Sequence, residues 1–472
     1  MSARTTRLSL AACLAGAVAP WLLGGTAFSA PDNDLTQVAV IALPASGGGG
    51  GHGGGGFGHG GGGGGFDAPG ALNSFDIGFV DPAIHTYVLA DRTNKAVDVV
   101  DTENNTFTKY LPANFVGNCA DVVPRGVPAS FCTNASGPNG VIISDHKEVW
   151  ATDAPPFRCS VGPPATCTLT GTSSVKVIDL KTGNFITIDT GGNKRTDELC
   201  EDPRHEVVLA ANNAPSDNFL TFISTETHKI LGKITFDGKD PRGDKIFANG
   251  IEQCQWNPRD EKFYLAIPDI GGSDGAVLVI STSAPFHVEK VFKIPTTTGC
   301  AGPTGLAIGP NHQIQLGCGG TNALIIDDRS GIIIKTELTE GGADEVWYDA
   351  GSNHYYLAHS GSPTATPPTV GRIGVEDAGP PPHEDADVIT GVVTVSAGTH
   401  SVAADPVHHF VYVPAGRAAT ICNFGAVTLN GEGCIAVFKS TNNTDDKNCL
   451  GPLTPAALHD DSATPFLREH CR

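Results

Sequence analysis

Short apolar or alternating runs, separated by clusters of turn-forming residues, recur along most of the chain. The segment Thr196–Phe236 shows the pattern most clearly, because it contains the runs DELCE, EVVLAAN, FLTFIST and KILGKITF in succession. Asp202–His205, Asn212–Asn218 and Thr225–His228 separate these runs. Alternation with a period of two residues predicts half-buried β-strands. Four short strands within about forty residues cannot bury both faces alone, which predicts one blade of a β-propeller.

The same unit recurs, and a turn resembling Asp-Pro marks the end of each first strand. The turn occurs seven times, at Asp81-Pro82, Asp145-His146, Asp202-Pro203, Asn257-Pro258, Gly309-Pro310, Asp349-Ala350 and Asp405-Pro406. Second and third strands follow each turn, as in the runs TYVLA and AVDVVD of the first repeat. The sequence therefore predicts an all-β fold, a seven-bladed β-propeller over residues 74–439.

The last repeat lacks a fourth strand. After Lys439 the chain continues as TNNTDDKN, which is a poor strand sequence. Thr36–Pro44, TQVAVIALP, resembles the fourth strands of the other repeats. We therefore predict that an N-terminal strand closes the last blade, which pairs the first and last repeats and removes an open sheet edge.

The termini outside the propeller have their own signatures. Residues 1–29 are typical of a secretory signal peptide, with Arg4 and Arg7 before the apolar run Leu8–Leu23 and a small-residue cleavage site at Ala27–Ser29. A lipidation motif ending at Cys13 is an alternative. Residues 30–73 contain the closing strand and a flexible Gly/His-rich loop, whose His52 and His59 could also bind a soft metal. We expect residues 440–472 to form a C-terminal tail that the pair Cys449–Cys471 pins by a disulfide.

Charge and hydropathy limit the classes of partner. The formal net charge is −20, which disfavours binding to nucleic acid and to anionic lipid. Beyond the signal peptide, no run is long enough to span a bilayer. We predict an exported monomer, periplasmic or extracellular, without membrane insertion.

Cysteine usage agrees with export. The chain has 13 cysteines, and cleavage of the signal peptide removes Cys13, so that an even number remains for disulfides. No C-x-x-C occurs, which weakens thiol-redox, zinc-ribbon and c-type haem interpretations. Local spacing suggests, without fixing the connectivity, the pairs Cys119–Cys132, Cys159–Cys167, Cys300–Cys318, Cys422–Cys434, Cys449–Cys471 and Cys200–Cys254.

Two stretches resemble a known family of repeat proteins. Tyr87–Thr102, YVLADRTNKAVDVVDT, resembles the YVTN-type propeller repeat, and Asp405–Val413, DPVHHFVYV, is similar to the turn that precedes that repeat. The resemblance covers roughly residues 74–439 and implies the propeller fold. The family includes lactonases, quinoprotein-like proteins and exported proteins without known chemistry, so it implies no single activity.

The long insertions are expected on one face of the propeller, called the top, where each first strand begins. They are Pro112–Pro138, Ala154–Thr172, Ser360–Gly371 and Ala415–Gly433. Elaborated loops on one face of a rigid scaffold are typical of the functional side. Histidines near the opposite turns, such as His205 and His312, are predicted to have local turn roles.

Equivalent positions near the top of the first strands carry the candidate site. Counting back five residues from each turn gives Asp76, Gly140, Asp197, Glu252, Thr304, Asp344 and His400. Strand alternation is expected to direct these side chains to the channel mouth, and their neighbours Glu198, Gln253 and Glu345 toward the blades or the rim. Carboxylates this close resist joint ionisation, so a cation would stabilise them.

We predict a divalent cation held by Asp76, Asp197, Glu252, Asp344 and His400. Oxygen donors favour calcium, and the imidazole keeps zinc, manganese or copper open. A polar, water-filled channel is the alternative. Other catalytic signatures, such as G-x-S-x-G, H-E-x-x-H and a P-loop, do not occur.

Three functions remain open, so the sequence does not decide whether the protein is an enzyme. The first is a protein that binds a small molecule, a metal or a protein partner on its top face. The second is a metal-dependent hydrolase of the lactonase type, with Asp197, Glu252 or Asp344 as the catalytic base. The third is an accessory protein of a periplasmic quinone- or copper-linked redox system.

Overall fold

The computed structural model describes residues 35–44, 71–132, 134–160, 162, 164–213, 218–238, 246–361, 370–379, 389–417, 419–425, 427, 429 and 431–440. The statements below concern these residues. The predicted signal peptide, the glycine-rich loop and the tail beyond Ser440 lie outside them. In the described part of the chain, no helix is long and apolar enough to cross a membrane.

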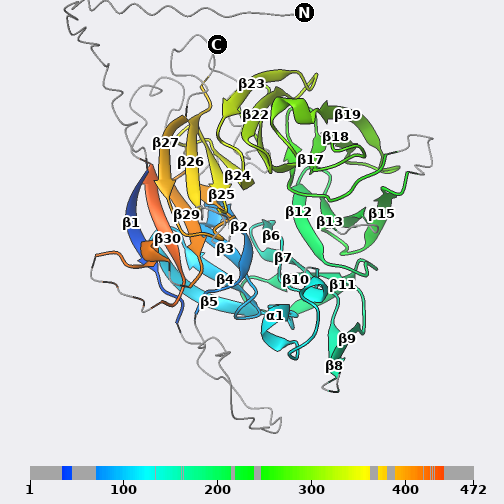
Figure 1. Ribbon diagram of the computed structural model, residues 1–472, viewed down its shortest axis with the longest axis vertical. Coiled ribbons are helices and arrows are strands. Elements are labelled where there is room, and N and C mark those ends of the chain that lie inside the picture. The colour runs from blue at the N-terminus through cyan, green and yellow to red at the C-terminus, as the bar shows by residue number, and fades with distance from the viewer. Residues whose placement is uncertain are drawn as a thin grey trace, which may run out of the picture. The chain divides into compact units, whose positions relative to one another are not determined.

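Seven four-stranded antiparallel sheets form the blades of a β-propeller (Figure 1). Blade 1 contains β2 (Phe75–Asp81), β3 (Thr86–Asp91), β4 (Ala96–Asp101) and β5 (Thr106–Pro112). Blade 2 contains β6 (Val141–Ser144), β7 (Glu148–Asp153), β10 (Ser174–Asp179) and β11 (Phe185–Asp189). Blade 3 contains β12 (Thr196–Asp202), β13 (Val207–Asn212), β14 (Phe219–Ser224) and β15 (Ile230–Thr235). Blade 4 contains β16 (Cys254–Asn257), β17 (Lys262–Ile267), β18 (Gly275–Ser281) and β19 (Val288–Ile294).

The remaining blades follow the same order. Blade 5 contains β20 (Pro303–Ile308), β21 (Gln313–Cys318), β22 (Asn322–Asp327) and β23 (Ile333–Leu338). Blade 6 contains β24 (Ala343–Asp349), β25 (His354–His359), β26 (Arg372–Asp377) and β27 (Ile389–Thr394). Blade 7 contains β28 (Ala403–Asp405), β29 (Phe410–Ala415), β30 (Cys434–Ser440) and the N-terminal strand β1 (Leu35–Ile41). A hairpin of β8 (Phe157–Ser160) and β9 (Thr166–Leu169) extends from blade 2.

Helical structure is confined to single turns in the loops of the described ranges. These are η1 (Pro82–Ile84), α1 (Cys119–Val122), α2 (Ala129–Cys132), η2 (Thr296–Thr298) and η3 (Thr420–Cys422).

The predicted closure of the last blade is confirmed. Strand β1 pairs antiparallel with β30, with Leu35 opposite Ser440 and Ile41 opposite Ile435. The blue strand and the orange strand lie side by side in Figure 1. Because β1 fills the outer position of blade 7, backbone hydrogen bonds join the N-terminal segment to the last repeat.

The hydrophobic core consists of seven clusters, each shared by two consecutive blades. One cluster joins blades 1 and 2, for example through Val97 and Val149, and the series continues around the ring. The last cluster joins blades 7 and 1, where Tyr412 packs with Tyr87. The inner strands are therefore buried on both faces, whereas the outermost strands alternate, as β15 does.

Hydrogen bonds within the turn explain the recurring Asp-Pro signature. The Asp202 carboxylate accepts hydrogen bonds from the backbone N–H of Arg204 at 2.9 Å and from that of His205 at 3.1 Å. Asp405 accepts one from the N–H of Val407 at 2.8 Å. The imidazoles of His205 and His408 contact the same carboxylates, at 2.6 and 2.8 Å. These histidines serve the turns, as the sequence predicts.

The suggested cysteine pairs are confirmed wherever the structure describes them. Disulfides join Cys119 to Cys132, Cys159 to Cys167, Cys200 to Cys254, Cys300 to Cys318 and Cys422 to Cys434. The bond between Cys200 and Cys254 links the first strands of blades 3 and 4. The suggested pair Cys449–Cys471 lies outside the described residues.

Candidate functional site

The predicted top face carries the long insertions. They connect β5 to β6, β7 to β10, β25 to β26 and β29 to β30. The first connection leads from one blade to the next, and the other three join second and third strands. All of them therefore emerge where the first strands begin. The connections on the opposite face are short turns, except for the longer one between β26 and β27.

Each predicted site residue lies at the start of a first strand. Asp76, Asp197 and Asp344 belong to β2, β12 and β24, whereas Glu252 and His400 lie just before β16 and β28. His400 Nε2 lies 3.0 Å from Asp76 Oδ1. The Asn213 side-chain amide donates to Asp197 Oδ2 at 3.0 Å and to Glu252 Oε1 at 3.1 Å. The charge of Asp344 acts on His400 and on Asp76, so the five side chains share one electrostatic environment.

Gly140 and Thr304, at the two other aligned positions, serve the backbone. A Cβ atom on Gly140 would lie 2.2 Å from the carbonyl oxygen of Asp197, so only glycine allows the first strands of blades 2 and 3 to approach this closely. The Thr304 hydroxyl donates to the carbonyl of Ala343 at 2.8 Å. Both residues help to fix the spacing of neighbouring blades at the channel mouth.

Two arginines at the channel mouth complete the group and were missed by sequence reasoning. Arg92 forms an ion pair with Asp76 and donates to Asn139 Oδ1. Arg195 Nη2 lies 2.6 Å from Asp197 Oδ2, and its charge also interacts with Asp76, Glu252 and Asp344. Arg92 follows β3 directly and Arg195 directly precedes β12. The signal that could have identified both arginines in the sequence is their position beside strand ends on the top face.

Burial and neighbouring charges separate the pKa values of the carboxyl groups. Burial alone would raise the pKa of Asp76, but Arg92 and the His400 hydrogen bond outweigh it and lower the pKa to about 2. Burial and the charges of Asp197 and Asp344 raise the pKa of Glu252 to about 8. Burial also raises the pKa of Asp197 and that of Asp344 above their usual values, against the attraction of Arg195 for Asp197 and of His400 for Asp344. The mouth therefore holds both ionised and protonated carboxyl groups near neutral pH.

Glu198 and Glu345 correct one expectation. They do not face the blades or the rim, because they hydrogen bond to one another although they belong to blades 3 and 6. Blades 3 and 6 are not neighbours in the ring, so the two side chains meet across the channel. A hydrogen bond between two carboxyl groups requires a proton on one of them. Burial and the partner's charge raise the pKa of Glu198 well above its usual range.

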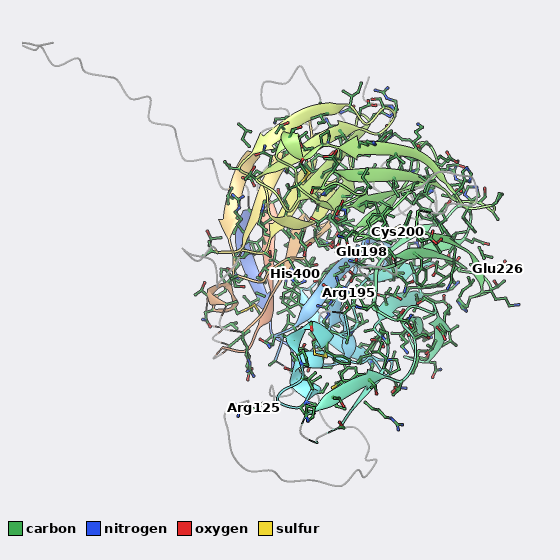
Figure 2. All side chains as sticks on the ribbon, turned by 45° about the vertical axis from the view of Figure 1, so that its right-hand side comes forward. Arg125, Arg195, Glu198, Cys200, Glu226 and His400 are labelled. Atoms are coloured by element: carbon green, nitrogen blue, oxygen red, sulfur yellow. A yellow bond between two sulfur atoms is a disulfide. The ribbon has the colours of Figure 1, made fainter. Side chains whose placement is uncertain are left out.

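A β-bulge explains why consecutive residues face the channel. Thr196 and Leu199 of β12 are three residues apart, but their partners in β13, Asn212 and Ala210, are only two residues apart. The pairing of β24 with β25 shows the same kind of shift between Ala343 and Glu345, and so do the first strands of blades 1 and 5. The extra residue breaks the strict alternation of side chains. Figure 2 shows Arg195, Glu198 and His400 near the middle of the ring, with Arg125 and Glu226 at its periphery.

Glu198→Gln is expected to reduce the loss of stability that occurs as the pH rises above about 4.5. The folded pKa of Glu198 is raised, so its stabilising contribution is complete below the unfolded value near 4.5 and is lost as the pH rises toward the folded value. Each pH unit between these values costs roughly 1.4 kcal/mol, which the amide avoids. Urea unfolding across this range measures the effect. The exposed Glu226→Gln is the matched control, and parallel profiles for the two variants would contradict the assignment.

The charges at the mouth do not balance when every acid is ionised. Six carboxyl groups, those of Asp76, Asp197, Glu198, Glu252, Asp344 and Glu345, face Arg92, Arg195 and His400. Even with His400 protonated, an excess of three negative charges remains. Protons or a bound cation can neutralise this excess. In the described residues, no group of three or more His, Cys, Asp or Glu side chains is arranged to hold a metal ion.

Comparisons with known proteins support no inference beyond the structure described above. No family model matches the chain, and no curated protein matches it. One solved structure, a chain of "Crystal Structure of Mitotic Checkpoint Complex", is similar with a TM-score of 0.47 and 11% sequence identity, and the match covers 93% of this chain and 99% of that one. Similarity at this level supports no statement about function. The chain is a disulfide-bonded seven-bladed β-propeller with a charged channel mouth.

Proposed function

We propose that the chain is an exported binding protein that takes a small, positively charged ligand at the channel mouth. The observation that carries the proposal is the excess of acid over base among the six carboxyl groups defined above. Glu252, with a pKa of about 8, holds a proton near neutral pH that a cationic ligand can displace. Neighbouring carboxylates disfavour one another's ionisation, and a bound cation stabilises the ionised form in place of the proton.

The spread of the acids favours an organic amine that carries two positive charges at separate points. Asn213 and Arg195 lie between the acids of blades 1, 3, 4 and 6, which spreads the carboxylates around the mouth instead of gathering them on one point. A diamine can reach two such acids at once with its donors. The predicted divalent cation, with Asp76, Asp197, Glu252, Asp344 and His400 as ligands, stays a prediction that the same experiment addresses.

Calorimetric titration with putrescine, calcium chloride and zinc chloride tests the proposal. We expect putrescine to bind with release of protons, seen as a heat that depends on the ionisation enthalpy of the buffer. The Glu252→Gln variant is expected to bind about tenfold more weakly, because it lacks one acidic group. Exposed Glu226→Gln is the matched control. Absence of binding by all three probes, or equal affinity of the two variants, would refute the proposal, whereas binding of a metal alone would redefine the ligand.

A hydrolase is the second candidate, and one observation favours it. A buried carboxyl group with a pKa near 8, such as Glu252, is matched to general acid–base catalysis near neutral pH. The resemblance to the YVTN-type family, which includes lactonases, agrees with this reaction class. Turnover on a panel of lactones, measured with and without chelator, tests it. Activity that Glu252→Gln abolishes would support the hydrolase, and activity that survives the substitution would exclude Glu252 as its base.

A further inference from the structure

A cavity separate from the channel mouth lies on the top face between blades 1 and 2. Its volume is about 730 Å³, within the range of pockets that hold small organic molecules. The loop from β5 to β6 forms one side, and blade 2 with the start of its hairpin insertion forms the other. Residues that define its chemistry are Lys95, Val116, Pro124, Asp153, Phe157 and Lys176. None of the residues that line the cavity belongs to the channel-mouth group.

Lys176 supplies a buried positive charge to this cavity. The residue is 8% exposed and lies on β10. Its Nζ atom donates to Thr187 Oγ1 at 3.3 Å and lies 4.0 Å from Asp153 Oδ2. An ammonium group has three donors, and a buried charge is costly without partners. The two contacts found among the described residues are long, so the ammonium can donate a further hydrogen bond to a molecule in the cavity.

The two acids that line the cavity are held by the chain itself. Asp153 Oδ1 accepts from the backbone N–H of Ala154 at 3.0 Å and of Val116 at 3.3 Å. Burial raises the pKa of Asp153 to about 7, against the attraction of Lys176. Asp189, the other acid, accepts from the Thr172 hydroxyl at 2.5 Å and from the N–H of Gly191 at 2.7 Å. Lys95 adds a second positive charge at the exposed side of the cavity.

The remaining walls are apolar and are held in place by disulfides. Val116, Pro124 and Phe157 contribute apolar surface, and the Phe157 ring packs edge-on against Phe131 with 5.2 Å between centroids. Cys119–Cys132 closes the loop on one side, and Cys159–Cys167 closes the hairpin on the other. Covalently closed loops lose less conformational entropy when a ligand binds, which favours a preformed pocket.

We propose that this interblade cavity is a second binding site, for a small organic carboxylate with an apolar body. The Lys176 ammonium pairs with the carboxylate at the buried side, and the apolar body packs against Phe157 and Pro124. Lys95 attracts the anion at the exposed side. Affinity rises as the pH falls through the region where Asp153 takes up a proton, because its negative charge then disappears beside the bound anion.

Benzoate and hexanoate are suitable probes, with benzyl alcohol as the uncharged analogue. Saturation-transfer NMR and calorimetry are expected to show binding of both anions to the full chain. Lys176→Met is expected to weaken benzoate about tenfold or more, and Lys181→Met, an exposed lysine on the bottom turn of the same blade, leaves the affinity unchanged. Asp153→Asn is expected to remove the pH dependence. Circular dichroism and the melting temperature establish that each variant is folded.

Three results would overturn the proposal. They are no binding of either anion up to about 10 mM, equal affinity of Lys176→Met and wild type for benzoate, and equal binding of benzoate and benzyl alcohol. If Lys176→Met does not fold, the comparison of benzoate with benzyl alcohol on the wild-type protein decides whether a charge is recognised. Phe157→Ala then decides the location, because loss of the aromatic wall weakens benzoate only if it occupies this cavity.

Discussion

Arg195→Met is expected to lower the free energy of unfolding by about 3–5 kcal/mol, the range for removing one partner of a buried ion pair. The guanidinium lies 2.6 Å from the Asp197 carboxylate and interacts with the charges of Asp76, Glu252 and Asp344. Methionine fills part of the volume but leaves those acids without this cation. The channel mouth then carries a larger excess of negative charge. To reduce this excess, the folded protein binds more protons than the wild type does.

The loss is expected to grow with pH. Removing Arg195 raises the folded pKa of Asp197, Glu252 and Asp344 further above their unfolded values, so stability is retained at low pH and is lost as the pH rises. Urea unfolding at about pH 5 and about pH 8 therefore gives a larger difference between variant and wild type at the higher pH. Arg125→Met, at the periphery in Figure 2, is the exposed control and is expected to change stability by less than about 0.5 kcal/mol. Equal losses for the two variants would show that Arg195 does not neutralise the mouth.

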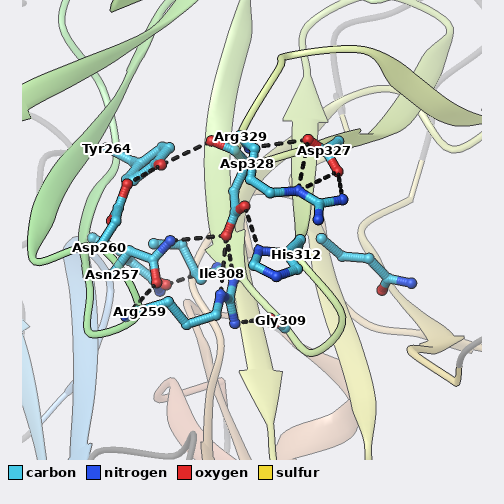
Figure 3. A network of polar contacts seen from close by, with 12 residues as sticks. Asn257, Arg259, Asp260, Tyr264, Ile308, Gly309, His312, Asp327, Asp328 and Arg329 are labelled. Carbon is cyan, nitrogen blue, oxygen red and sulfur yellow. Dashed lines mark hydrogen bonds and ion pairs between the residues drawn. The ribbon is translucent and has the colours of Figure 1, made fainter. Parts of the chain in front are cut away.

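Asp328→Ala is expected to cost a similar amount, about 3–5 kcal/mol, at the opposite face. The Asp328 carboxylate accepts from Asn257 Nδ2 at 2.9 Å and from Arg259 Nη2 at 2.6 Å, and it contacts His312 Nδ1 at 2.9 Å. Figure 3 shows these contacts around one buried carboxylate. Asn257 and Arg259 belong to the first turn of blade 4, whereas His312 and Asp328 belong to blade 5. Alanine therefore removes the acceptor that joins two blades.

The adjacent Asp327 provides a matched control. Its carboxylate bonds within its own turn, to Arg329 and to the N–H of Ser330 at 2.9 Å, and Figure 3 shows it beside Arg329, separate from the group around Asp328. Asp327→Ala changes the same charge one residue away, but it loses only local turn contacts, worth about 1 kcal/mol. Urea unfolding at neutral pH compares the two variants. A loss in Asp327→Ala as large as that in Asp328→Ala would contradict the role assigned to the network between blades.

Local patterns were sufficient to predict much of the fold. Alternation with a period of two and the recurring Asp-Pro turn predicted seven blades, and the match of Thr36–Pro44 to the outer strands predicted the closing strand. Both predictions rest on interactions between neighbours in sequence or between equivalent repeats. The turn carboxylates cap their own backbones, for example Asp202 with Arg204 and His205, so the signature is local in origin.

Equivalent positions in the repeats also placed the five candidate residues at the channel mouth. Each first strand begins at the same face, so the residues five positions before each turn lie near the same end of their strands. Their role as ligands stays a prediction. It could not place Glu198 and Glu345, since the bulge in β12 and in β24 breaks the alternation on which the expected direction depended. A bulge depends on pairing with the second strand and leaves little trace in a single strand's sequence.

The chain's repeats and turns thus predicted the seven-bladed ring and its closing strand, and cysteine spacing suggested the five disulfides that the structure describes. The tertiary structure decided which charges meet. Arg195 reaches the acids of other blades, Glu198 meets Glu345 across the channel, and Lys176 faces a cavity built by two blades and two loops. These contacts join residues far apart in the sequence, and their pKa values depend on burial and on partners that no local pattern contains.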